Sequence, residues 1–158
     1  MISTTADSPV GKLCLVSDGE ALVSLRFGEG GDDEPDYIIK KTLCELAEYF
    51  EGRRQSFDIP LKVSGTEFQR AVWNALCAIP FGETRSYSDI AAAVGSKRAC
   101  RAVGMANNRN PIAILIPCHR VIGSDGSLTG YAGGLEIKKR LLAYESGGEP
   151  RCFERINK

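Results

Sequence analysis

Residues 66–95 of this 158-residue chain contain several helix-start and helix-stop signals, which restrict its second half to short helices. Thr66 with Gln69, and Ser86 with Asp89, match the capping box, in which two side chains satisfy the first free backbone groups of a helix. Between these signals the apolar residues recur at the spacing of one helix face. The expected helices then end at proline and glycine, namely Pro80, Gly82 and Gly95.

A third short helix is predicted directly after Gly95. Ser96 can cap it, and it should run to about Ala106, so that residues 86–106 form a helix-turn-helix candidate. Basic groups near its first turn suit phosphates, which the helix dipole also attracts. Small side chains farther along would let a large surface approach the backbone. An ordinary exposed helix could share this pattern. The basic residues are Lys97, Arg98 and Arg101.

The stretch after this helix is predicted to contain a buried strand and a last helix. Residues 107–111 are turn formers, and the apolar run 112–116 has the length of a buried strand. A glycine-rich loop covers residues 123–134. Residues 135–145 have helical spacing, with three leucines expected to face inward: Leu135, Leu141 and Leu142.

The first 60 residues predict a small α/β domain. Strands are expected at residues 13–16 and 21–27, because the Asp18-Gly19 pair between them is a hairpin signal. Residues 37–50 have helical spacing, and residues 59–61 are interpreted as a linker. We therefore divide the chain into a domain at 1–60, a second domain at 61–150 and a polar tail at 151–158.

Composition excludes several classes of protein. A hydrophobic fraction of 43% and a charged fraction of 25% are ordinary for a globular protein. The sequence has neither the roughly 20-residue apolar run that spans a bilayer nor a secretion signal, so we expect a cytoplasmic protein, or a nuclear one in a eukaryote. Its six cysteines are scattered, and His119 is its one histidine. We therefore expect no disulfide framework and no metal site, and interpret most cysteines, including Cys77 and Cys100, as packing residues.

The zero net charge hides an asymmetry between the two halves. Residues 1–60 carry 12 acidic and 6 basic side chains, whereas residues 61–158 carry 8 acidic and 14 basic ones. Between Arg85 and Arg109 there are five basic residues and one acidic residue. This distribution favours a polyanionic partner on one face, although chance clustering on a solvated surface would look similar.

Cys118 and His119 form the one nucleophile-and-base pair that is adjacent in the sequence. A thiol reacts as a thiolate and therefore needs a base or a positive charge beside it. Adjacent side chains on a strand point to opposite faces, so a direct contact requires a local turn or a bridging water, and Pro117 favours an irregular backbone. A buried structural cysteine beside a satisfied histidine would give the same dipeptide.

Six ordered blocks between Phe68 and Glu145 resemble the O6-alkylguanine-DNA alkyltransferases (methylated-DNA–protein cysteine methyltransferases). The central block is the hexapeptide at 116–121, Ile-Pro-Cys-His-Arg-Val. The others include Arg-Ala-Val-Gly at 101–104, Asn-Pro at 110–111, Gly-Tyr-Ala-Gly-Gly-Leu at 130–135 and Leu-Leu-Ala-Tyr-Glu at 141–145. Residues 1–60 are only weakly similar to the variable N-terminal domain of that family.

The resemblance implies an α/β N-terminal domain, ribonuclease H-like, with a small sheet plus a helix. A mainly α, winged helix-turn-helix-like C-terminal domain would follow. The activity implied is a single-turnover transfer of an alkyl group from O6-alkylguanine in double-stranded DNA to the protein, after the nucleotide is flipped out. O4-alkylthymine stays open as a second substrate. The resemblance implies neither a cofactor nor a metal. It implies a monomer that has no obligate protein partner and does not bind a membrane.

The resemblance also implies a role for each matching residue. Cys118 would accept the alkyl group, His119 would deprotonate it through a water, and Glu145 would bind the imidazole. Asn110 would hold a tight turn, Tyr87 would help rotate the nucleotide and give a proton to guanine, and Arg120 would support the site. Arg101 would enter the duplex. The DNA contacts and the base pocket would be completed by Ser96, Lys97, Arg98, Ala102, Gly104, Tyr131, Ala132 and Val121.

Three other functions stay open at this point. A non-catalytic damage sensor would share the resemblance but lack the acceptor cysteine, which is present here as Cys118. A helix-turn-helix regulator would need neither Cys118 nor His119. A thiol hydrolase would use them but turn over without DNA. Some members of the family have serine at the position of Ala132, so one pocket hydrogen bond is expected to be missing. A zinc site in residues 1–60, which some members have, is not expected, because no histidine lies there.

Overall fold

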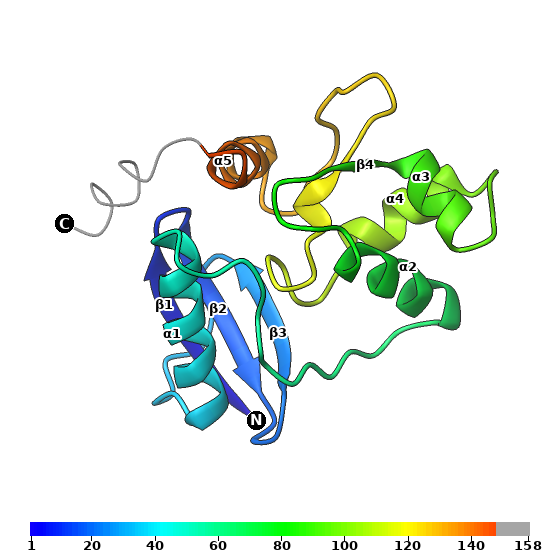
Figure 1. The fold of residues 1–158 in the computed structure, drawn as a ribbon. Coiled ribbons are helices and arrows are strands. Elements are labelled where there is room, and N and C mark those ends of the chain that lie inside the picture. Colours follow the sequence, from blue (N-terminus) through cyan, green and yellow to red (C-terminus); the bar gives the residue numbers. More distant parts are fainter. Residues whose placement is uncertain (148–158) are drawn as a thin grey trace. The chain divides into compact units, whose positions relative to one another are not determined.

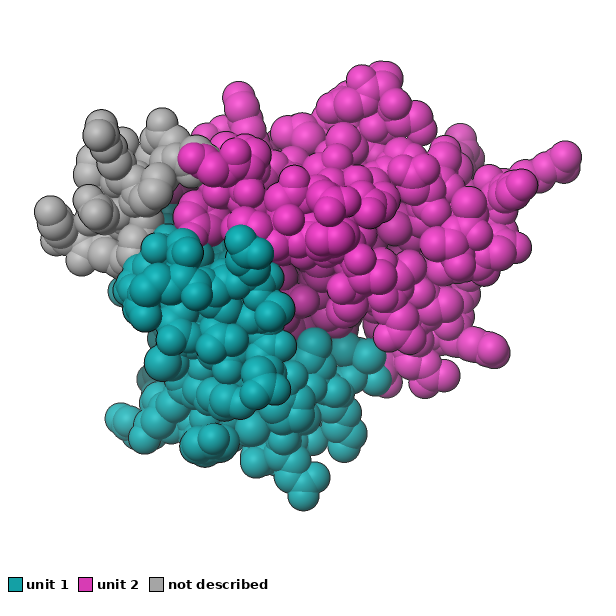
Figure 2. Space-filling view, viewed as in Figure 1, with its two compact units in different colours: residues 1–63, 148–158 teal, residues 64–147 magenta. Residues whose placement is uncertain are grey.

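The computed structural model describes residues 1–147, which form two compact units at residues 1–63 and 64–147 (Figure 2). The first unit is a three-stranded antiparallel sheet in the order β1-β2-β3, followed by helix α1 (Figure 1). Its elements are β1 (Ile2–Ser8), β2 (Gly11–Ser17), β3 (Leu22–Phe27) and α1 (Tyr37–Phe50). The hairpin of β2 and β3 and the bounds of α1 confirm the predictions for this half.

Two parts of the sheet were not predicted. Strand β1 pairs with β2 from Ile2 opposite Ser17 to Ser8 opposite Gly11, but it is rich in serine and threonine and lacks a strong apolar pattern. Residues 59–61, which we interpreted as a linker, also contact the sheet. The backbone N–H of Leu22 donates to the Pro60 carbonyl at 2.8 Å, and that of Lys62 donates to the Leu22 carbonyl at 3.0 Å, so Leu61 forms a single parallel bridge with Leu22 at the start of β3.

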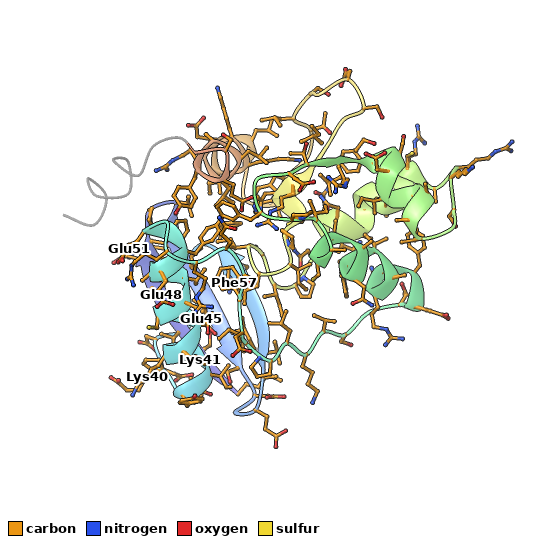
Figure 3. The ribbon with its side chains drawn as sticks, in the orientation of Figure 1. Lys40, Lys41, Glu45, Glu48, Glu51 and Phe57 are labelled. Carbon is orange, nitrogen blue, oxygen red and sulfur yellow. The ribbon has the colours of Figure 1, made fainter. Side chains whose placement is uncertain are left out.

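A buried carboxylate joins α1 to the segment that follows it. Glu45 is only 4% exposed, and its Oε1 accepts a hydrogen bond from the backbone N–H of Asp58 at 2.7 Å. Arg54 and Lys41 lie 3.5 and 3.8 Å from the same carboxylate, so its charge is compensated. Figure 3 labels Lys41 and Glu45, which both lie on α1. Glu45 is therefore a structural residue of the first unit.

The second unit is mainly helical. Its helices are α2 (Glu67–Cys77), α3 (Tyr87–Ala93), α4 (Cys100–Asn108) and α5 (Leu135–Glu145), and strands β4 (Arg85–Ser86) and β5 (Val121–Ile122) form a parallel pair. Both predicted capping boxes are present, at Thr66 with Gln69 and at Ser86 with Asp89. The indole Nε1 of the buried Trp73 donates to the Ala106 carbonyl at 2.9 Å and joins α2 to α4.

Several predictions for this unit were wrong in detail. Ser96 does not cap α4, because residues 96–99 close a turn of their own, in which Ala99 N–H donates to the Ser96 carbonyl at 2.8 Å. Lys97 and Arg98 consequently lie in that turn, before the helix. Leu135 is 49% exposed, because it begins α5 outside the core.

The expectation that most cysteines are buried was also wrong. Of the five cysteines in the described part of the chain, only Cys14 and Cys118 are buried, while Cys44 and Cys77 are exposed and Cys100 is intermediate. The tail at 151–158, with Cys152, lies outside the described residues. No helix within residues 1–147 is long and apolar enough to cross a membrane.

Loss of the first capping box should weaken the second unit measurably. We expect Thr66→Ala to lower the free energy of unfolding by about 1 kcal/mol, because the N–H of Gln69 loses its acceptor. Urea denaturation would measure the change. Thr66→Ser, which keeps the hydroxyl, should unfold close to the wild-type midpoint; equal losses in both variants would contradict a capping role.

Candidate functional site

The segment that leads to Cys118 is a compact turn. The predicted strand at 112–116 is wrong, because the Asn110 side chain occupies the backbone groups that a neighbouring strand would need. Its Nδ2 donates to the Ile116 carbonyl at 2.7 Å, and its Oδ1 accepts from the Ile112 N–H at 2.9 Å. Ile114 adopts a left-handed backbone with φ of 71°, which β-branched residues rarely adopt. Burial of the whole apolar run holds this turn.

Residues 118–120 form one turn of 3₁₀ helix directly after the Asn110 turn. The backbone N–H of Cys118 donates to the Ile116 carbonyl at 2.8 Å, and that of Arg120 to the Pro117 carbonyl at 3.0 Å. In such a turn consecutive side chains do not alternate between opposite faces. The irregular backbone expected at Pro117 is therefore present, and all three side chains of the turn are buried.

The carboxylate of Glu145, at the end of α5, forms hydrogen bonds with the side chains of the two residues that follow Cys118. His119 Nε2 lies 2.7 Å from Glu145 Oε2, and Arg120 donates through Nε to Oε1 at 2.7 Å and through Nη2 to Oε2 at 3.0 Å. Arg120 Nη1 also donates to the Ile79 carbonyl at 2.7 Å. The carboxylate charge is therefore compensated by a guanidinium, and the imidazole is held in one orientation.

His119 is neutral and presents a free base to the interior. It is completely buried, and burial lowers the pKa of its imidazole despite the opposing effect of Glu145. Because Nε2 meets an acceptor, the proton of the neutral ring lies on Nε2 and the lone pair lies on Nδ1. No donor among residues 1–147 reaches that Nδ1. His119 can therefore accept a proton there.

The Cys118 side chain is a buried thiol. Burial raises the pKa of the thiol, while hydrogen bonds from Asn110 and Tyr131 and the charge of Lys138 act in the opposite direction. The pKa remains raised on balance, so the resting group is the thiol and must lose its proton before it reacts as a nucleophile.

Lys138 is a site residue that our sequence reasoning missed. Lys138 is fully buried, and its Nζ donates to the Thr129 carbonyl at 3.1 Å. Burial lowers the pKa of the Lys138 amine. The Nζ lies 5.9 Å from the ring centroid of Tyr87 and 6.0 Å from that of Tyr131. The signal was present in the sequence, because Lys138, Leu141, Leu142 and Glu145 follow the spacing of one helix face.

The two tyrosines lie around this lysine. Tyr87 donates from its hydroxyl to the Thr129 carbonyl at 3.0 Å, the acceptor that Lys138 also uses. Tyr131 places its hydroxyl in the interior, and burial raises the pKa of that phenol well above its usual range. Of the other predicted pocket residues, Ala132 is exposed in its loop, whereas Val121 is fully buried in β5.

The predicted DNA-contact residues form an exposed surface of their own. Arg101 and Ala102 are exposed on α4, Lys97 and Arg98 are exposed in the preceding turn, and Ser96 is half-buried. Gly104 faces Tyr87, since a Cβ there would lie 3.9 Å from the tyrosine ring. Met105, which our sequence analysis did not single out, is 60% exposed one helical turn after Arg101. Residues 96–109 contain four basic residues and no acidic residue.

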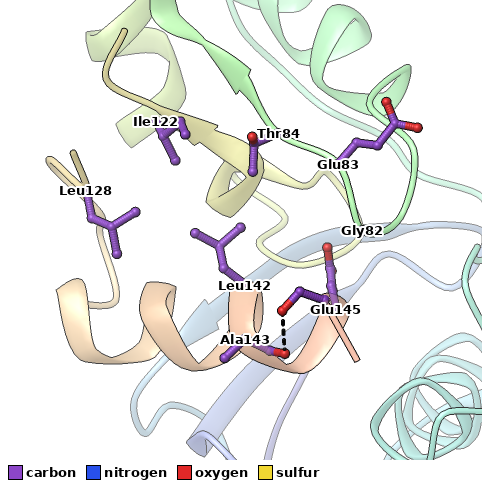
Figure 4. Close-up of a pocket in the computed structure, with 9 residues that line it drawn as sticks. Gly82, Glu83, Thr84, Ile122, Leu128, Leu142, Ala143 and Glu145 are labelled. Atoms are coloured by element: carbon purple, nitrogen blue, oxygen red, sulfur yellow. Dashed lines mark hydrogen bonds between the residues drawn. The ribbon is translucent and has the colours of Figure 1, made fainter. Parts of the chain in front are cut away.

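A cavity of about 250 Å³ lies beside the C-terminal part of α5 (Figure 4). Its lining includes the apolar side chains of Ile122, Leu128 and Leu142. Glu145 lines it, but Cys118 and His119 do not. Ser146 also lines it, and its hydroxyl donates to the Ala143 carbonyl at 3.0 Å. The nucleophile and the base therefore do not open into this cavity.

Two family models match the chain and together cover almost all of it. The 6-O-methylguanine DNA methyltransferase ribonuclease-like domain matches residues 1–63, and the DNA binding domain of the same name matches residues 67–147. These matches confirm the predicted fold class of a small α/β domain followed by a helical DNA-binding domain.

Curated relatives and solved structures agree with the family models. The methylated-DNA–protein-cysteine methyltransferase of Methanosarcina mazei is 59% identical over 146 residues, covering 87% of this chain and 92% of its own. That of Methanosarcina barkeri is 52% identical over 147 residues, covering 88% and 93%. A crystal structure of Mycobacterium tuberculosis OGT in complex with DNA superposes with a TM-score of 0.87 at 43% identity, covering 98% of both chains.

The buried neutral imidazole should make stability depend on pH. The pKa of His119 is lower in the folded protein than in the unfolded chain, so the unfolded chain binds the extra proton first as the pH falls. We expect the free energy of unfolding to fall between about pH 7.5 and 5.5, across the ordinary histidine pKa near 6.5, and to fall less in His119→Gln. Urea denaturation at both pH values would measure this. An equal fall in both proteins would contradict it.

Proposed function

The chain belongs to the family of 6-O-methylguanine DNA methyltransferases, and we propose that Cys118 is the residue that accepts the alkyl group. The function is direct-reversal DNA repair, in which a methyl group passes from O6 of guanine in DNA to a cysteine of the protein. The observation that supports Cys118 is its position, since it is a buried thiol that immediately precedes the chain's one histidine, whose Nε2 lies on Glu145.

The proposed reaction begins with removal of the thiol proton. Cys118 gives its proton to a water, and that water gives a proton to Nδ1 of His119. The sulfur lone pair then forms a bond to the alkyl carbon, while the bond from that carbon to O6 breaks and leaves its electron pair on guanine. Tyr87 gives its hydroxyl proton to the guanine ring, and the proton taken up by His119 returns through solvent to the Tyr87 phenolate. Guanine is restored, and Cys118 becomes a thioether that neither water nor a cofactor cleaves, so one molecule reacts once.

Glu145 and Lys138 would lower the cost of the charges that form. Glu145 faces the imidazolium of His119 across the 2.7 Å hydrogen bond and stabilises its positive charge. The ammonium of Lys138 favours the thiolate of Cys118 and lies beside both tyrosine rings. Since these groups are buried and fixed before reaction, little reorganisation is needed when charge develops.

A guanine inside a duplex cannot reach a buried thiol, so we propose that the nucleotide is flipped out of the helix. The exposed face of α4 would enter the minor groove, where small residues fit and sequence is read poorly. Arg101 would occupy the space left by the base, and Met105 would follow it on the same face. Lys97 and Arg98 would bind phosphates. Tyr131, Ala132 and Val121 would line the base pocket.

We propose that the protein needs no partner other than damaged DNA. The site elements all belong to residues 64–147, so a monomer could carry out the transfer. It would work where the genome lies, in the cytoplasm of a bacterium or the nucleus of a eukaryotic cell. O4-alkylthymine is a second substrate to test, and the methyl side chain of Ala132 offers no hydrogen bond in the pocket.

Intact-protein mass spectrometry after incubation with an O6-methylguanine duplex tests the acceptor. We expect one methyl group per protein, with peptide mapping placing it on Cys118. Cys118→Ala should lose transfer completely while it still binds the duplex. Methylation of Cys118→Ala at another cysteine, or turnover beyond one methyl per protein, would contradict the proposal.

Arg101→Ala should separate nucleotide flipping from chemistry. We expect repair of duplex O6-methylguanine to slow by at least tenfold, because the extrahelical nucleotide loses the side chain that replaces it in the stack. Reaction with free O6-benzylguanine should stay within about twofold of wild type, since no base has to be flipped. Rates from quenched mass spectrometry would decide the matter, and equal losses on both substrates would argue against this role.

A further inference from the structure

Asn107 is a buried amide of which only one half has a protein partner. It lies on α4, is 2% exposed, and donates from Nδ2 to the Cys118 carbonyl at 3.3 Å. Its Oδ1 is buried, and no donor within residues 1–147 reaches it. A buried acceptor without a donor is costly, so it needs an explanation.

A second buried acceptor belongs to the side chain of His119, the residue that follows this carbonyl in the chain. The Cys118 carbonyl, which holds Asn107, is the carbonyl that links Cys118 to His119. His119 Nδ1 is the other buried acceptor here that no donor in the described chain reaches. One acceptor therefore belongs to the residue after Cys118, and the other to a side chain that is hydrogen-bonded to the Cys118 carbonyl.

We propose that Asn107 is a positioning residue that holds the water between Cys118 and His119. The inference rests on the proposed function and identifies what orients its proton relay. A buried water typically makes about three hydrogen bonds. Here its two hydrogens would go to Nδ1 of His119 and Oδ1 of Asn107, and its oxygen would accept from the S–H of Cys118. The donors and acceptors match one water molecule.

This arrangement gives the proton one direction. The thiol proton passes to the water oxygen, and the water's hydrogen on the imidazole side passes to Nδ1 of His119, so one S–H bond breaks and one N–H bond forms. The amide oxygen of Asn107 does not take up a proton near neutral pH, so it orients the water without changing. Without that anchor the water could point a hydrogen at the sulfur and leave no acceptor for the thiol proton.

The other groups around the thiol do not replace this acceptor. Burial raises the pKa of the Cys118 thiol, and the Asn110 and Tyr131 side chains and the charge of Lys138 act in the opposite direction. Glu145 and Arg120 are bonded to each other, and Glu145 meets the far nitrogen of His119. We therefore assign to Asn107 the role of the uncharged group that accepts a hydrogen bond from the water.

The pH profile of Cys118 alkylation by free O6-benzylguanine tests this role, because a free base removes DNA binding from the measurement. Wild type, Asn107→Leu and Asn74→Ala would be compared from pH 6 to 10 by intact mass spectrometry. Leucine matches asparagine in size but cannot accept a hydrogen bond, and Asn74 is an exposed residue of α2 that serves as control.

We expect Asn107→Leu to react at least tenfold more slowly than wild type at pH 7. The deficit should shrink toward pH 10, where hydroxide removes the thiol proton directly, and Asn74→Ala should follow wild type throughout. A deficit that is constant across the pH range, or no deficit, would overturn the inference and leave Asn107 a structural residue.

Two further comparisons keep the result decisive. Asn107→Ser retains a hydroxyl that can accept from a water and should recover part of the rate at pH 7; if Asn107→Leu does not fold, the shape of the serine profile decides, with a shrinking deficit expected. Failure of the wild-type protein to form an adduct on Cys118 would instead overturn the proposed function, and the inference with it.

Discussion

The second unit depends on the hydrogen bonds that the Glu145 carboxylate forms with His119 and Arg120. The carboxylate lies at the end of α5, and its two oxygens bind the His119 imidazole and the Arg120 guanidinium, while Arg120 continues to the Ile79 carbonyl beyond the end of α2. One buried side chain thus joins the last helix, the turn that carries the thiol and the first helix of the unit. Compensation by Arg120 allows a negative charge to remain in the interior. Burial lowers the pKa of His119, so its imidazole can act as a base.

Before DNA binds, the Cys118 thiol is inaccessible to solvent and protonated. Cys118 is 4% exposed, and burial raises the pKa of its thiol, so solvent-borne electrophiles meet a protonated and inaccessible sulfur. Reactivity would come from groups fixed around the sulfur, including His119, Lys138 and Tyr131, once a base occupies the pocket. A protein that reacts once benefits from this arrangement, since every unspecific reaction would consume a molecule.

The sequence predicted those elements whose signals are local. Capping boxes and apolar spacing placed α2, α3 and α5, and the hairpin signal placed β2 and β3. It failed where tertiary contacts override local preference, as at residues 112–116, where the Asn110 side chain replaces a neighbouring strand. Strand β1 lacks an apolar pattern, and Lys138 was overlooked because a lysine on a helix is usually exposed. The site motif itself was recognised through its resemblance to a family, and the pairing of His119 with Glu145 could not be deduced from spacing alone.

The left-handed backbone of Ile114 has a consequence for when the protein can react. Isoleucine does not choose this conformation on its own, so the turn exists only while the apolar run around it is buried and Asn110 holds both ends. A nascent or partly unfolded chain therefore has ordinary, accessible cysteine thiols and no aligned base. On the proposed function, folding both shields the Cys118 thiol from solvent and assembles the groups that would make it react with an alkylated guanine.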